Sequence, residues 1–119
     1  MLIIEDNAFI ALDLEAQLQD LGCEVVGTAV TASQAIEIAR RTLPDLALVD
    51  LQLADGSRGQ DAAQVLRSEL NVTSIILSGS LHAVTEEERL NIRPIAMLSK
   101  PVLPHELGGV VSGYQDRRH

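Results

Sequence analysis

The chain has 119 residues, a formal net charge of −8 and a hydrophobic fraction of 46%. This length suits one core, so we expect residues 1–119 to form a single domain. The negative charge argues against binding to nucleic acid, whose phosphates are neutralised by Lys and Arg. The longest apolar runs fall well short of the roughly 18 residues of a membrane span. The start MLIIEDN does not resemble a signal peptide. We therefore expect a cytoplasmic protein that does not bind a membrane.

Five short apolar runs have the length of β-strands, and several are rich in β-branched residues. They cover Leu2–Ile4, Val25–Val26, Leu46–Val49, Ile75–Leu77 and Ile95–Leu98.

Helical patterns follow these runs. Apolar residues recur every three or four positions in three segments, Ala8–Leu21, Thr31–Arg41 and Gly59–Leu70. Gly22 is placed to end the first of these helices. Two pairs have the spacing of a capping box, Thr31 with Gln34 and Thr85 with Glu88, and the second pair predicts a short fourth helix.

A fifth helix is predicted to begin at Pro104, because proline is favoured in the first turn. Gly108, Gly109 and Gly113 each disfavour a helix interior by about 1 kcal/mol relative to alanine. We therefore expect this helix to be short, frayed or stabilised by a partner, with little protection of its amides from exchange.

Strands that alternate with helices predict βαβ units and a parallel sheet covered on both faces. Five such units make a doubly wound (βα)5 α/β domain in three layers. Polar residues follow the predicted strands, and the carboxyl ends of parallel strands share one edge of the sheet, where ligands bind in such folds. These residues are Glu5, Asp6, Asp50, Ser78 and Lys100.

Such a cluster of carboxylates predicts a site for a hard divalent cation, because neighbouring carboxylates repel one another unless a cation compensates them. Lys100 supplies a positive charge suited to a phosphoryl oxygen, and Ser78 supplies a hydroxyl. Asp50 is then a candidate nucleophile that accepts a phosphoryl group as an acyl phosphate. Asp55, Gly56 and Gly59 predict a turn that lets the backbone approach the metal closely.

Four motifs in this order, IIEDN, LALVD, IILSGS and LSKP, resemble the receiver domain of bacterial two-component response regulators over essentially the whole chain. The resemblance implies a flavodoxin-like fold with the strand order 2-1-3-4-5. The segment DLQLADGSRG further resembles receivers of alphaproteobacterial general-stress regulators and small stand-alone receivers that serve related kinases.

The resemblance also implies roles for individual residues. Asp50 would accept phosphate from a phosphohistidine on a sensor histidine kinase. Asp6 would bind Mg²⁺ (or Mn²⁺) directly, Glu5 through water, and Gln52 through its backbone carbonyl. Ser78 and Lys100 would contact the phosphoryl group and take part in the switch.

The sequence departs from many receivers at Met97, where an aromatic residue usually responds to phosphorylation. Met97 is a possible replacement, because methionine repacks easily at adaptable surfaces. The domain would act by contact with a downstream regulator, or as a phosphate sink for a shared kinase. It would catalyse only its own phosphorylation and dephosphorylation.

The sequence is also compatible with other functions. The chain is alternatively a receiver excised from a larger regulator or hybrid kinase. An aspartyl-phosphate hydrolase is disfavoured, because Gln52 stands where such enzymes need a second carboxyl group. A nucleotide-binding switch is disfavoured because the chain lacks the glycine-rich phosphate-binding loop of such proteins.

Arg58 is interpreted as a solvated side chain or a partner contact, and the segment TEEER as a solvated helix start.

Overall fold

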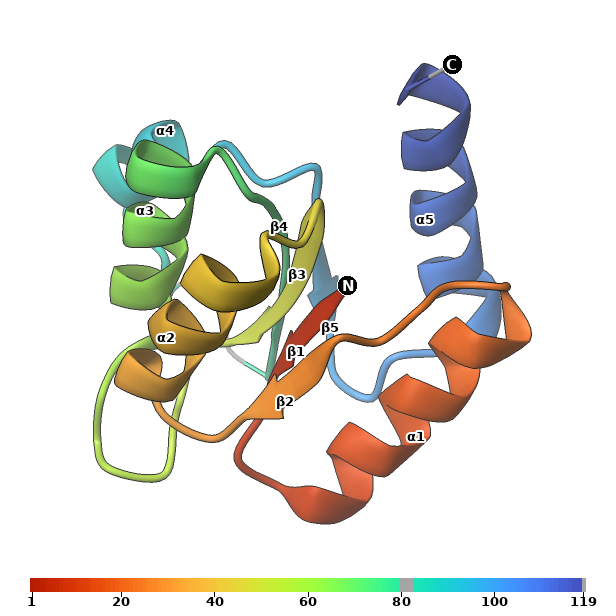
Figure 1. Cartoon of the computed structure of the whole chain (residues 1–119), viewed down its shortest axis with the longest axis horizontal. Coiled ribbons are helices and arrows are strands. Elements are labelled where there is room, and N and C mark those ends of the chain that lie inside the picture. The colour runs from red at the N-terminus through yellow and green to blue at the C-terminus, as the bar shows by residue number, and fades with distance from the viewer. Residues whose placement is uncertain (80–82, 119) are drawn as a thin grey trace.

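The computed structural model describes residues 1–79 and 83–118, so Ser80 of the IILSGS motif lies outside the described residues. Strands and helices alternate along the chain (Figure 1). The strands are β1 (Leu2–Ile4), β2 (Gly27–Ala29), β3 (Leu46–Asp50), β4 (Thr73–Ser78) and β5 (Ala96–Ser99). The helices are α1 (Ala8–Asp20), α2 (Ala32–Thr42), α3 (Gly59–Leu70), α4 (Glu86–Ile92) and α5 (Pro104–Arg118).

The strands form one parallel sheet in the order β2-β1-β3-β4-β5, which confirms the predicted doubly wound fold and its strand order. The register aligns Ile4 with Val49 and Asp50 with Leu77. The carboxyl ends of β1, β3, β4 and β5 therefore meet at one edge of the sheet.

Helices cover both faces of the sheet (Figure 1), and an apolar cluster fills the space on each face. Helices α2, α3 and α4 cover one face, where Ala39, Leu66 and Ile92 join the core residues of the strands. Helices α1 and α5 cover the other face through residues such as Leu14 and Val111. Both faces of the sheet are therefore buried under helices. Within the described residues, no helix is both long and apolar enough to cross a membrane.

The second strand is Gly27–Ala29 rather than the predicted Val25–Val26. Gly27 pairs with Leu2, and α2 packs closely over it, since a Cβ at this position would lie 3.0 Å from Cγ2 of Ile38. Pairing with β1 and packing under α2 therefore determine this edge strand, and the local apolar pattern does not.

The fifth helix is not short: it runs for 15 residues from Pro104, the predicted start. Leu107 and Val111 are buried against the sheet, while Gly109 is exposed. Tertiary packing thus offsets the low helix propensity of the glycines.

The two predicted capping boxes differ. The box of Thr85 and Glu88 is complete, as predicted. At α2, the Thr31 side chain caps the backbone N–H of Gln34. The Gln34 side chain, however, accepts a hydrogen bond from the backbone N–H of Val30 at 3.0 Å and not from Thr31, so the capping box of α2 is only half formed.

Candidate phosphoryl and metal site

The polar residues predicted at the strand ends surround one cavity of about 430 Å³ at the carboxyl edge of the sheet. They arrive there from four strands of a parallel sheet, which brings distant segments to one edge. The lining includes Glu5, Asp6, Asp50, Gln52, Ser78 and Lys100, together with Asn7, Ile10 and Gly79.

Lys100 bridges two buried carboxylates in this cavity. Its Nζ lies 2.7 Å from Oε1 of Glu5 and 3.3 Å from Oδ2 of Asp50. Glu5 is 1% exposed and Asp50 is 6% exposed, so both carboxylates have lost most of their hydration. Burial by itself lowers the pKa of Lys100, but the hydrogen bond to Glu5 and the charges of Asp50 and Glu5 outweigh it and raise that pKa above its usual value.

Backbone groups hold the two buried carboxylates in place. The N–H of Asn7 donates to Oε2 of Glu5 at 3.2 Å, and the N–H of Gln52 approaches Oδ1 of Asp50 at 3.5 Å. Each acid therefore has one oxygen near Lys100 and the other near the backbone.

Glu5, Asp6 and Asp50 each offer a carboxylate oxygen within 4.8 Å of the others. Asp6 is exposed, whereas its two neighbours are buried. Oxygen ligands of this kind are those that Mg²⁺ and Mn²⁺ prefer, and a divalent cation would compensate the charge that a single lysine leaves unbalanced. The donor set thus fits the predicted metal.

The loop after Asp50 packs tightly against the site. A Cβ on Gly59 would lie 1.9 Å from the backbone oxygen of Asp50, so only glycine fits there. Gly56 adopts a φ of 79°, and Oδ1 of Asp55 accepts a hydrogen bond from the N–H of Ser57. The predicted turn is therefore present, and it closes with an antiparallel bridge between Gln52 and Arg58.

Met97 lies in β5 opposite Ile76 and is partly buried against the core under α2, α3 and α4. It also lines a surface hollow with Arg89, Leu90 and Arg93 of the α4 region. The possible switch residue therefore contacts the α4 side of the molecule and does not line the cavity around Asp50.

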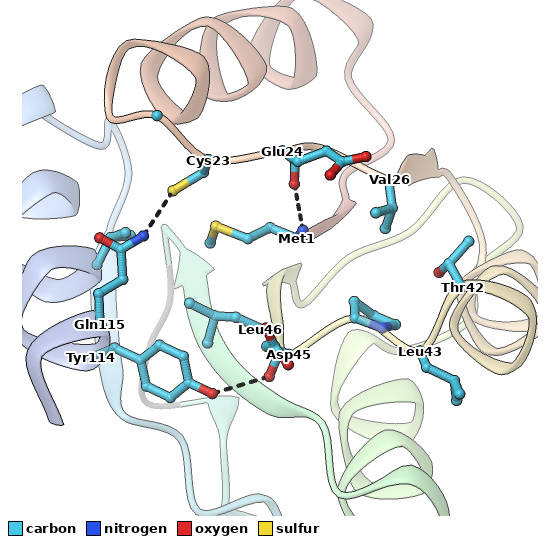
Figure 2. Close-up of a pocket in the computed structure, with 13 residues that line it drawn as sticks. Met1, Cys23, Glu24, Val26, Thr42, Leu43, Asp45, Leu46, Tyr114 and Gln115 are labelled. Atoms are coloured by element: carbon cyan, nitrogen blue, oxygen red, sulfur yellow. Dashed lines mark hydrogen bonds between the residues drawn. The ribbon is translucent and has the colours of Figure 1, made fainter. Parts of the chain in front are cut away.

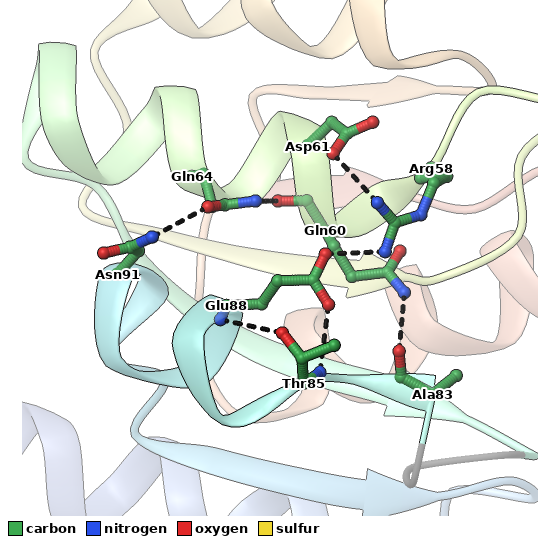
Figure 3. Close-up of polar contacts among 8 residues, drawn as sticks. All are labelled: Arg58, Gln60, Asp61, Gln64, Ala83, Thr85, Glu88 and Asn91. Carbon is green, nitrogen blue, oxygen red and sulfur yellow. Dashed lines mark hydrogen bonds and ion pairs between the residues drawn. The ribbon is translucent and has the colours of Figure 1, made fainter.

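Two interpretations made from sequence are correct only in part. The Arg58 side chain is 49% exposed, but its Nη2 also lies 2.6 Å from Oε2 of Glu88 (Figure 3). The segment TEEER starts α4 and exposes Glu86 and Glu87, whereas Glu88 is buried, with only 11% of its side chain exposed. Their only sequence signal is the capping-box spacing of Glu88, which does not indicate a partner from another helix.

A second cavity, of about 310 Å³, lies at the opposite, amino end of the strands (Figure 2). Several of its polar groups contact one another. The Met1 ammonium donates to the carbonyl of Glu24 at 2.6 Å, and the Tyr114 hydroxyl to the carbonyl of Asp45 at 3.4 Å. This cavity is separate from the carboxylate cluster.

The sequence of residues 1–112 matches the family described as the response regulator receiver domain. The chain belongs to this family, and it is a receiver domain of two-component systems.

Among curated proteins, the chain is 39% identical over 113 residues to the phyllosphere-induced regulator PhyR of Methylorubrum extorquens, covering 94% of this chain and 42% of that protein. It is 32% identical to the transcriptional regulatory protein PdtaR of Mycobacterium tuberculosis, covering 85% of this chain and 49% of that protein. The chain thus spans less than half the length of these two relatives.

Solved structures agree with the fold. The receiver domain of PhyR from Erythrobacter litoralis superposes with a TM-score of 0.85 at 33% identity, covering 94% of this chain and 85% of that one. The receiver domain of a modulated diguanylate cyclase from Desulfovibrio desulfuricans gives a TM-score of 0.84 at 31% identity, covering 93% and 88%. PhyR proteins thus occur among both the similar sequences and the similar structures, which supports the resemblance of this chain to receivers of general-stress regulators.

Proposed function

We propose that residues 1–119 form a phosphoacceptor domain in which Asp50 receives a phosphoryl group from a phosphohistidine of a sensor histidine kinase. The observation that carries this proposal is the position of the Asp50 carboxylate, which lies within 4.8 Å of two further carboxylates and 3.3 Å from the Lys100 ammonium. A nucleophilic oxygen is thus placed between a metal-ligand set and a fixed positive charge.

In the proposed step, an Asp50 carboxylate oxygen attacks the phosphorus atom. The new O–P bond forms as the N–P bond of the phosphohistidine breaks, and the electron pair of that bond stays with the imidazole nitrogen. Such transfers depend mostly on positioning and charge neutralisation. Bound Mg²⁺ would neutralise phosphoryl oxygens during this transfer.

The other residues of the cavity take distinct roles. Asp6 and the backbone carbonyl of Gln52 would ligate the metal directly, and Glu5 would do so through water. Lys100 would leave its position between Glu5 and Asp50 to contact a phosphoryl oxygen, and the Ser78 hydroxyl would bond to another. Since Gln52 has no carboxyl group to act as a general acid, we do not propose a hydrolase.

The surface next to the site suits a protein partner. Helix α1 begins directly after Asn7, which lines the cavity. On this helix, Phe9 is 84% exposed and Leu12 is 63% exposed. Exposed apolar side chains beside a reacting group favour the docking of a kinase helix. The phosphorylated domain would then signal by contact with a downstream regulator, with Met97 in the place of the aromatic switch, or drain phosphate from a shared kinase.

Phosphorylation with a small donor tests the proposal. The chain is incubated with acetyl phosphate and Mg²⁺, and phosphoryl uptake is followed by intact mass and by release with hydroxylamine. We expect one group on the wild type, none on Asp50→Asn and strongly reduced uptake by Asp6→Ala. Asp20→Asn, an exposed acid at the end of α1, is the matched control and should behave as the wild type. Stable uptake by Asp50→Asn would refute the assignment. Phosphotransfer from candidate histidine kinases, followed in both directions, then distinguishes a forward signal from a sink.

A further inference from the structure

Polar side chains of α3 and of the loop before it contact α4 and the segment just before α4 at three places (Figure 3). Arg58 pairs with Glu88, with 2.6 Å between Nη2 and Oε2. The Gln60 amide donates to the carbonyl of Ala83 at 3.4 Å, and Asn91 donates to Gln64 at 3.1 Å. A continuous set of contacts thus joins the two elements on one side of the sheet.

Arg58 is the member of this set that also belongs to the loop around the phosphoryl site. It forms the antiparallel bridge with Gln52, whose backbone carbonyl is the proposed metal ligand. Arg58 therefore pairs through its backbone with the loop residue two positions after Asp50, and its guanidinium contacts a buried acid of α4.

Glu88 links Arg58 to the first turn of α4. Its Oε1 accepts the backbone N–H of Thr85 at 3.0 Å and closes the capping box, while its Oε2 is held by Arg58. Charge-assisted hydrogen bonds are stronger than neutral ones, and the Glu88 end of this pair is buried while the Arg58 side chain is 49% exposed. Displacement of Arg58 would therefore weaken the first turn of α4, a helix of only seven residues.

Gln60 indicates that this set of contacts is not optimal as it stands. Its side chain is buried, yet its Oε1 has no hydrogen-bond donor within residues 1–79 and 83–118. An unsatisfied buried oxygen is costly, so a second arrangement that supplies a donor would compete with this one.

We infer that Arg58 couples the occupancy of the Asp50 site to the conformation of α4 through Gln52 on one side and Glu88 on the other. This inference rests on the proposed function. The Arg58–Glu88 ion pair connects the loop after Asp50 to α4. It would act in a chain that has Met97 where many receivers have an aromatic switch residue. Because coupling is reciprocal, whatever holds α4 in place also alters affinity at the metal site.

Amide exchange of α4 tests this inference on the full chain. Exchange over Glu86–Ile92 is measured by mass spectrometry with Mg²⁺ alone and with Mg²⁺ plus beryllofluoride, which mimics a phosphoryl group. Binding of beryllofluoride is followed separately by ¹⁹F NMR, at concentrations that saturate each variant. The variants are Arg58→Met, Arg58→Lys and the control Arg40→Met. Arg40 forms an ion pair with Glu69 at 2.8 Å between α2 and α3, and there the acid is 52% exposed, against 11% for the side chain of Glu88.

In the wild type and in Arg40→Met, we expect beryllofluoride to change the exchange rate of α4 amides roughly fivefold or more. In Arg58→Met the probe should still bind while most of this change is lost, and Arg58→Lys should restore part of it by keeping the cation. Glu88→Gln removes the charge from the other end of the pair and gives a second test if Arg58→Met folds poorly.

A full response of α4 in a folded Arg58→Met or Glu88→Gln variant would overturn the inference, as would an unchanged α4 in wild-type protein that has bound the probe. Failure of wild-type protein to bind beryllofluoride would instead contradict the proposed function, and with it the inference that rests on it. The ¹⁹F signal distinguishes the two failures.

Discussion

Lys100 and Glu5 are 95 residues apart in the sequence, yet their charged groups lie 2.7 Å apart in the folded chain. Glu5 is 1% exposed, so its carboxylate depends on this ammonium group in the absence of a metal. Lys100 is also the only lysine in the sequence. The charge balance of the whole cavity therefore depends strongly on one side chain.

Lys100→Met should destabilise the protein by about 3 kcal/mol at neutral pH without divalent cations, because it leaves two buried carboxylates without their cation. Urea unfolding measures this loss. Added Mg²⁺ should restore more stability to Lys100→Met than to the wild type, because ligands that bind only the native state stabilise it. Arg40→Met, which breaks an exposed pair, should cost less than about 1 kcal/mol. Equal losses in the two variants would contradict this account of the cavity.

The stabilisation by Lys100 should disappear in alkali. Burial by itself lowers the pKa of Lys100. The Glu5 hydrogen bond and the charges of Asp50 and Glu5 together outweigh burial and raise this pKa above its ordinary value of 10.5. Because the pKa is raised in the folded state, the stabilisation that Lys100 gives the fold is fully present below pH 10.5. It is lost as the pH rises through the pKa of Lys100 in the folded protein. The difference in unfolding free energy between wild type and Lys100→Met should therefore be constant near neutral pH and shrink above 10.5. A difference that stays constant through this range would count against the raised pKa.

Glu88 should contribute stability with the opposite dependence on pH. The backbone hydrogen bond from Thr85 lowers the pKa of Glu88, against a smaller effect of burial, and Arg58 lowers it further. The contribution is thus present above the ordinary value of 4.5 and is lost as pH falls through the lowered folded value. We expect Glu88→Gln to be less stable than wild type near pH 7 and the two to converge in acid. Glu86→Gln, at an exposed site on the same helix, should stay close to wild type throughout.

Two glycine substitutions should act in opposite directions. Gly59→Ala places a Cβ against the backbone of Asp50, so it should cost about 2 kcal/mol or more and reduce phosphoryl uptake. Gly109→Ala meets nothing within 4 Å in an exposed turn of α5 and should stabilise the protein by about 0.5–1 kcal/mol. Chemical unfolding measures both changes. Amide exchange of α5 before and after Gly109→Ala also tests the expectation that this helix is weakly protected.

The sequence by itself was sufficient for the architecture. Alternating apolar runs and helical patterns predicted the (βα)5 fold, because the periodicity of buried side chains is a local property of each element. The same reasoning placed Glu5, Asp6, Asp50, Ser78 and Lys100 at one edge of the sheet, since the carboxyl ends of parallel strands share an edge. Local pattern failed at β2 and in the length of α5, where pairing with β1 and burial of Leu107 and Val111 outweigh propensity.

Only the tertiary structure decided which side chains contact one another. Arg58 and Glu88 each have an ordinary surface pattern in the sequence, and their pairing depends on how α3 and α4 pack side by side. The need for glycine at position 59 likewise arises from the close approach of two backbone segments. Periodicity predicts which face of an element is buried, but the partner of a long polar side chain depends on the distance and orientation between elements, which no local pattern carries.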